Sequence, residues 1–207
     1  MSTSDRDKWQ ERYRAGAYTG RDQPSVLLAE HMPDIVATQR AVAGEDAELR
    51  ALDVACGAGR NAIYLAGLGY RVDGLDIAAE ALSRADDTAR RAGLEISWIE
   101  HDLDRGLPRR LPDYDLIVVM RYLDLSLVQA AAQRLRPGGY LLCEVHMISD
   151  EPVIGPRDAN FRARPGELRA AAGDLEVVEH WEGRTKDPDG RDVALARLVA
   201  CRLYDIP

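Results

Sequence analysis

Cysteine is scarce in this sequence, and its spacing is uninformative for metals. The three cysteines among 207 residues form neither a Cys-x-x-Cys pair nor a set of metal ligands. Each lies in or beside an apolar run, so we expect buried, reduced thiols, no metal site and a cytoplasmic protein. The first residues lack the apolar segment of a signal peptide, and no apolar run approaches the length of a membrane span.

Positive charge is also in deficit. The chain has 27 Lys and Arg against 35 Asp and Glu, a formal net charge of −8, and so lacks the basic balance of a dedicated nucleic-acid binder. Its 46% hydrophobic and 30% charged residues are those of a soluble globular protein, and its length suits one domain. We therefore expect a monomer or weak homodimer whose partner is a small molecule, with no membrane partner; the charge disfavours a nucleic-acid substrate and leaves RNA as an alternative.

The most informative stretch runs from residue 49 to residue 76. A short apolar run ends in a turn with Gly57 and Gly59, a helical pattern follows, and a second strand-like run ends on Asp76. Strand, glycine turn, helix, strand and acid, in this order, are typical of a βαβ nucleotide-binding unit. The two glycines let the backbone approach a ligand closely, and the acid can accept both hydroxyls of a ribose.

This unit has two interpretations. Gly57-x-Gly59-x-x-Ala62 fits the dinucleotide pattern of NAD enzymes, but Asp53, just before the turn, would repel a pyrophosphate and suits an ammonium instead. The stretch Leu-Asp-Val-Ala-Cys-Gly-Ala-Gly-Arg resembles the first motif of class I methyltransferases that use S-adenosylmethionine. We favour that cofactor, because an NAD oxidoreductase would also need a hydride-transfer group such as Tyr-x-x-x-Lys, which we do not recognise.

The remaining pattern predicts an α/β fold: a single Rossmann-like, doubly wound sheet of about seven strands. It should be mostly parallel, with an antiparallel C-terminal hairpin and helices on both faces. Asp187-Pro188-Asp189-Gly190 is a strong turn signature between the last two strands. Further strands are expected at 94–100, 114–120, 140–145, 177–183 and 193–203, and helices at 4–15, 26–32, 34–43, 78–91, 127–135 and 166–172.

Two segments are expected to flank the site. Residues 1–48 should form a helical arm and residues 49–207 the methyltransferase core, with a proline-rich, lid-like insertion at 147–165. The arm, Trp-Gln-Glu-Arg-Tyr-Arg-x-Gly-x-Tyr, resembles that of tellurite-resistance-type methyltransferases, and Gly-Arg-Asn, Leu-Arg-Pro-Gly-Gly and Arg-Pro-Gly-Glu-Leu resemble the tellurite-resistance and thiopurine-type branch. In such proteins the arm lies over the cofactor pocket. Alternatively, Trp9 and Tyr13 only dock this helix on the core.

The resemblance implies which residues hold the cofactor. Asp53 and the backbone of Gly57 and Gly59 would bind its amino-acid part, and Asp76 its ribose. Ile77 would border the adenine, while Asp102 faces the adenine amino group or caps a turn. The remaining expected cofactor contacts are Cys56, Arg60, Leu103, Arg121, Trp9 and Tyr13.

Methyl transfer is an in-line displacement, so the protein mainly positions the reactants and excludes water. Arg121, Glu144 and His146, at strand ends, are the candidate catalytic residues. Arg121 either anchors an anionic acceptor or pairs with Asp124 or Glu144. His146, where related sequences differ, either accepts a proton or is structural. Tyr122 is also expected near the methyl group.

We expect a small acceptor, anionic or electron-rich, closed over by residues 1–24 and 147–165. A positive pocket in a negative protein would favour small acids or oxyanions. The alternative function is a methyltransferase-fold protein that binds the cofactor without turnover, as a sensor or partner subunit. Arg162, Arg164 and Arg184 either line the acceptor pocket or are solvated, and Tyr18 and Arg157 belong to the two segments expected to close over the acceptor.

Overall fold

The computed structural model describes residues 3–17 and 19–204, built around one seven-stranded sheet of order β3-β2-β1-β4-β5-β7-β6. Strands β1 to β5 pair in parallel, whereas β7 is antiparallel to both β5 and β6. The predicted fold class, including the antiparallel hairpin, is confirmed. The strands are β1 (Arg50–Val54), β2 (Arg71–Asp76), β3 (Ile96–Glu100), β4 (Tyr114–Met120), β5 (Leu135–His146), β6 (Glu176–Lys186) and β7 (Asp192–Cys201).

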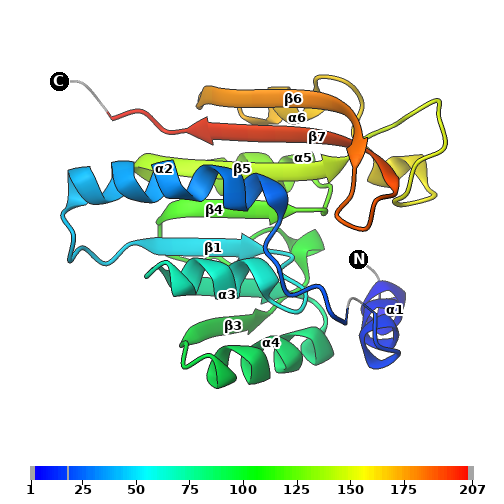
Figure 1. Cartoon of the computed structure of the whole chain (residues 1–207), viewed down its shortest axis with the longest axis horizontal. Helices are drawn as coiled ribbons and strands as arrows, with labels where there is room; N and C mark the ends of the chain where they lie inside the picture. Colours follow the sequence, from blue (N-terminus) through cyan, green and yellow to red (C-terminus); the bar gives the residue numbers. More distant parts are fainter. Residues whose placement is uncertain (1–2, 18, 205–207) are drawn as a thin grey trace.

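Helices cover both faces of the sheet (Figure 1). On one face α2 and α3 join a core cluster with Leu116 and Val118, while on the other α5 and α6 join a second cluster with Ile117 and Val119. Successive residues of β4 therefore point into different cores, which is why its sequence is almost wholly apolar. The helices are α1 (Thr3–Arg14), α2 (Val26–Ala43), α3 (Arg60–Gly67), α4 (Ala79–Arg91), α5 (Leu125–Ala132) and α6 (Glu167–Ala171), with short 3₁₀ turns at Leu103–Arg105 and Ala159–Phe161.

Several predicted boundaries were wrong, and the physical reason is clear for three of them. Pro33 does not separate two helices but lies inside α2, where burial of the neighbouring apolar face outweighs the hydrogen bond that proline removes. Helix α5 is capped by Asp124, whose Oδ1 accepts from the Leu127 N–H at 3.0 Å, and begins two residues early. Strand β5 begins at Leu135, before the glycine turn, because this segment pairs with β4 across a bulge.

The carboxyl ends of the parallel strands are flanked by three segments. Figure 1 shows α1, the segment 147–165 and the β6–β7 turn at this end of the sheet. The predicted turn is confirmed, since Gly190 N donates to Asp187 O at 2.8 Å and Asp187 N to Arg191 O at 2.9 Å. Over the described ranges, no helix combines the length and apolarity needed to cross a membrane.

The N-terminal 48 residues divide into two parts. Helix α2 is built into the core through Leu27, Leu28 and Met32, whereas α1 contacts α4 instead. We therefore restrict the lid proposed from the sequence to the residues before α2, and the lid itself stays a prediction.

Candidate functional site

The glycine turn after β1 has an unusual backbone. Ala55, Gly57 and Gly59 adopt φ of +55°, +56° and +78°, which an alanine rarely does. Such strain persists where the surroundings enforce it and is concentrated at functional sites. Cys56 N donates to Leu75 O at 2.9 Å, which ties the turn to the end of β2. The Cys56 side chain is a buried free thiol whose pKa is raised by burial, so it contributes no charge.

Asp76 fastens the same turn from β2. Its Oδ2 accepts from Gly57 N at 2.8 Å and its Oδ1 from Ala78 N at 2.9 Å. Burial raises its pKa, although these backbone N–H groups oppose the shift. Each carboxylate oxygen can accept a further hydrogen bond, so the group can serve the turn and a ribose together.

Asp53 is the most deeply buried acid at this end of the sheet. It is 1% exposed, and its Oδ2 accepts from Ala62 N, in the first turn of α3, at 3.0 Å. Burial raises its pKa to about 7, a shift that the Ala62 N–H and the charge of Arg60 only partly oppose. A ligand cation beside this carboxylate would favour its ionised form.

The predicted adenine side is formed by the ends of β2, β3 and β4. Ile77 and Leu103 are buried there. Asp102 caps the 3₁₀ turn by accepting from Asp104 N at 3.2 Å, and its contact with the adenine amino group stays a prediction. Tyr122 lies close enough to Asp102 and Asp76 that their charges, after burial and Asp124, raise its pKa to about 12.

Helix α1 rests beside the glycine turn. The Trp9 and Tyr13 rings are tilted against each other, with centroids 6.5 Å apart, and pack with Ala58, Ala78 and Ala81. A Cβ on Gly57 would lie 2.5 Å from the Tyr13 hydroxyl, so the ring touches the turn itself. These two aromatics dock the arm, and they dock it at the predicted cofactor site.

The arm is also tied to α4 and β3. Arg84 donates to Tyr13 O, Gln10 accepts from Glu80 N at 3.1 Å, and Arg6 and Glu100 form an ion pair at 3.5 Å. Tyr18, predicted in the arm, lies outside the described residues.

A buried ion-pair network lies at the ends of β4 and β5. Arg121 Nε donates to Glu144 at 2.7 Å and its Nη2 to Asp187 at 2.9 Å, while Arg197 donates to the other oxygen of Glu144 at 2.8 Å. Glu144 is only 2% exposed, and Arg121 has a φ of +63°. Arg121 therefore pairs with Glu144, as one alternative predicted, and not with Asp124.

The network changes the role we assign to Glu144. Both of its oxygens are engaged by arginines, which leaves it poorly placed to accept a proton. We propose that it orients Arg121. Asp187 and Arg197 were missed by the sequence analysis, which interpreted the Asp-Pro-Asp-Gly stretch only as a turn; no local pattern indicates that this turn folds back to β4.

His146, at the end of β5, has a neutral ring. Burial, with the positive charges of Arg121 and Arg162, lowers its pKa to about 4. Among the residues described, its Nδ1 is buried without a hydrogen-bond partner, and a Cβ on Gly155 would lie 2.6 Å from that atom. The segment 147–165 thus passes directly over the ring, and His146 is a weak base at neutral pH.

The arginines of this segment mostly bind other groups of the protein. Arg162 donates to the carbonyls of Met147, Ile154 and Pro156, which braces the segment. Arg164 pairs with Glu167, and Arg184 with Glu151, both near the surface. Arg162, expected either to line an acceptor pocket or to be solvated, thus uses three of its donors to hold the backbone of the segment.

Other arginines gather at the rim instead. Arg60, the first residue of α3, donates to Gln23 O at 3.3 Å, and its pKa is lowered by burial and by the charges of Arg121 and Arg21. Arg21, from the arm, pairs with Asp189 at 3.6 Å and Asp187 at 3.9 Å. Three arginines from separate segments thus lie near one another beyond β1 and β4.

Comparison with known proteins identifies this architecture. A family model described as a methyltransferase domain matches residues 51–139. The chain belongs to the class I S-adenosylmethionine-dependent methyltransferases, and S-adenosylmethionine is its cofactor. It is 30% identical over 181 residues to a ubiquinone biosynthesis O-methyltransferase of Burkholderia vietnamiensis, covering 74% of this chain and 78% of that protein. The corresponding protein of Burkholderia multivorans is 31% identical over the same shares.

Solved structures of other proteins are similar to this one. TehB from Haemophilus influenzae, a tellurite-resistance protein, is 26% identical, with a TM-score of 0.66 over 82% of this chain and 62% of that one. The resemblance to the tellurite-resistance branch is thereby confirmed. Magnesium protoporphyrin IX methyltransferase from Synechocystis, 19% identical, has a TM-score of 0.65 over 97% and 98% of the two chains and shares the fold.

Proposed function

We propose that this methyltransferase acts on a small anionic or electron-rich acceptor bound beyond the ends of β4 and β5. The observation that carries this proposal is the group of Arg21, Arg60 and Arg121 in a chain of formal charge −8. Glu144, Asp187 and Asp189 offset part of this charge, so a small anion would be attracted by the guanidinium donors themselves, whereas the negative outer surface repels polyanions. Arg121 has five N–H donors and spends two on its acids, which leaves donors for a carboxylate or oxyanion.

We infer that the cofactor lies across the glycine turn. Asp53 would hold its ammonium and Arg60, at the start of α3, its carboxylate. Asp76 would accept the ribose hydroxyls, with Ile77, Asp102, Leu103 and Tyr122 around the adenine. The residue types fit this ligand, since Asp53 is a buried acid that would meet its cation, and the backbone of Gly57 and Gly59, at positive φ, would contact its amino-acid part.

The acceptor atom is proposed to be oxygen. The similar curated proteins are named O-methyltransferases, which supports an oxygen nucleophile. Its lone pair would form the new bond to the methyl carbon as the carbon–sulfur bond breaks, leaving a neutral thioether. An oxygen that is already anionic needs no base, which suits a site where Glu144 is engaged and His146 is weakly basic. The anion also matches the arginines at the rim.

We further propose a cytoplasmic location and a monomer or weak homodimer. The free thiols support the first, because Cys56 and Cys143 are buried and unpaired.

Replacing Arg121 should weaken turnover of the acceptor without weakening binding of the cofactor. In Arg121→Met we expect the kcat/KM for the acceptor to fall about tenfold to a hundredfold, because the acceptor loses one charge-assisted hydrogen-bonding partner. The dissociation constant for S-adenosylhomocysteine, measured by calorimetry, should change by less than about threefold.

The matched control is Arg197→Met. This side chain donates to the same buried Glu144, so both variants should lower the melting temperature by a similar amount. Only Arg121→Met should lose acceptor turnover to the stated extent. Equal losses of turnover in the two variants would show that Arg121 acts only by keeping Glu144 in place, and would remove the anchoring role.

A further inference from the structure

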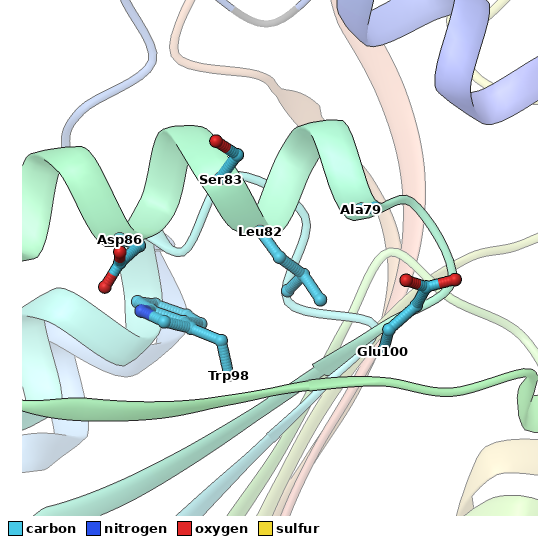
Figure 2. Close-up of a pocket in the computed structure, with 6 residues that line it drawn as sticks. All are labelled: Ala79, Leu82, Ser83, Asp86, Trp98 and Glu100. Carbon is cyan, nitrogen blue, oxygen red and sulfur yellow. The ribbon is translucent and has the colours of Figure 1, made fainter.

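Trp98 has an unusual place for an aromatic side chain. It lies in β3, the edge strand of the sheet, and reaches under α4. Figure 2 shows its ring below that helix. A surface hollow of about 370 Å³ lies beside the ring. On the hollow side, the ring is bordered by Ala79, Leu82, Ser83, Asp86 and Glu100. The ring is therefore only half-buried, and its role does not follow from filling the centre of a core.

The other side of the ring meets two glycines. A Cβ on Gly59, in the cofactor turn, would lie 2.6 Å from Cη2 of Trp98, and a Cβ on Gly74, in β2, would lie 2.7 Å from Cε3 and Cζ3. Both positions must lack a side chain for the ring to fit. The six-membered part of the indole thus fills the space between the strand that ends in Asp76 and the turn that Asp76 holds.

Gly74 and Gly59 are unfavourable for the stability of the segments that contain them, which indicates that the contact with the ring is needed. Gly74 lies within a strand, where a glycine weakens the element and marks a close approach by another group. Gly59 has a φ of +78° and would also clash with the Ala85 side chain of α4. The turn is therefore held from below by Trp98 and α4, in addition to the Asp76 carboxylate at Gly57.

We propose that Trp98 is a positioning residue for the cofactor, which fixes the height of the Gly57–Gly59 backbone above the sheet. The inference rests on the cofactor site proposed above. If the ring shrinks, Gly59 can sink toward the sheet, and the backbone no longer meets the amino-acid part of the cofactor at the same place. The acceptor and its arginines lie at other strands, so their contribution should not change.

The first test is a comparison of Trp98→Leu and Trp98→Phe with the wild type. Calorimetry with S-adenosylhomocysteine should give a dissociation constant raised about tenfold in Trp98→Leu and by a smaller factor in Trp98→Phe, which keeps an aromatic ring. The KM for S-adenosylmethionine should rise in parallel. The kcat at saturating cofactor should stay within about twofold, since the reacting groups are untouched.

The matched control is Ile96→Ala, two residues earlier on the same face of β3. Ile96 and Trp98 pack against the same core cluster, so the control loses packing without reaching the turn. It should lower the melting temperature and leave the dissociation constant within about twofold. A Trp98→Leu variant that loses thermal stability but binds S-adenosylhomocysteine like wild type would overturn the proposal, because Trp98 would then only pack.

A second pair of variants keeps the test decisive if Trp98→Leu folds poorly. Gly74→Ala places a methyl against the indole and should also raise the dissociation constant, whereas adding Trp98→Leu removes the clash. We expect the double variant to bind more tightly than the product of the two single effects predicts. Additive effects would contradict the proposed contact. Wild-type protein that does not bind S-adenosylhomocysteine would instead reject the cofactor site as a whole.

Discussion

Asp76→Asn is expected to lose at least about a hundredfold in affinity for S-adenosylhomocysteine. The carboxylate would make two charge-assisted hydrogen bonds to the ribose, each contributing about 1.5–3 kcal/mol. Both of its oxygens also accept backbone N–H groups, from Gly57 and Ala78. An amide offers one oxygen and one N–H₂ group, so it cannot accept from both backbone N–H groups. We therefore expect a lower melting temperature as well.

The control for this variant lies in the same strand. Asp73 is three residues earlier, and its Oδ2 accepts from the Tyr114 hydroxyl at 2.7 Å, on the side away from the turn. Asp73→Asn makes the same chemical change and keeps an acceptor for that hydroxyl. Calorimetric titration should show affinity unchanged in Asp73→Asn and lost in Asp76→Asn. Retained affinity in Asp76→Asn would mean that the ribose is held elsewhere.

Cofactor affinity should also depend on pH through Asp53. Burial raises the pKa of this carboxyl to about 7 in the free protein, so below that pH it is mostly protonated. The ammonium of the cofactor favours the ionised form and lowers the pKa in the complex. Binding then releases a proton, and affinity should fall by up to about tenfold for each pH unit below 7 while changing by only about twofold between 7 and 8.

Titrations with S-adenosylhomocysteine at pH 6, 7 and 8, in buffers of different ionisation enthalpy, measure both the affinity and the proton release. Asp53→Asn should bind more weakly at pH 8 and lose the dependence between pH 6 and 7, because the substituted amide does not ionise. A wild-type affinity that is the same at pH 6 and pH 8 would rule out Asp53 as the group that meets the ammonium.

Local sequence patterns were sufficient to predict the elements around the proposed cofactor site. The turn at Gly57 and Gly59, the acid at Asp76 and the apolar β4 are consequences of neighbouring residues, so spacing alone placed them. The antiparallel hairpin followed from its turn signature in the same way. The order of the strands was not predicted from the sequence and comes from the structure.

The acceptor half depends on contacts between residues far apart in sequence. Arg121 meets Asp187 across 66 positions, and Arg197 meets Glu144 across 53, so no local pattern could indicate either pair. Arg162 shows the same limit, since its three backbone partners are set by the path of the loop. Trp98 was interpreted only as part of an alternating strand, and its contact with Gly59 required the structure.

The most direct test of the proposed function uses acceptors matched in shape and different in charge. Wild-type protein with S-adenosylmethionine would be incubated with small phenolic carboxylic acids and with the corresponding neutral methyl esters, and S-adenosylhomocysteine formation would be followed. We predict turnover of an acid at a kcat/KM at least about tenfold above that of its ester, with the difference lost in Arg121→Met. Equal turnover of acid and ester, or preference for the ester, would contradict an anionic acceptor held by the arginines of the rim.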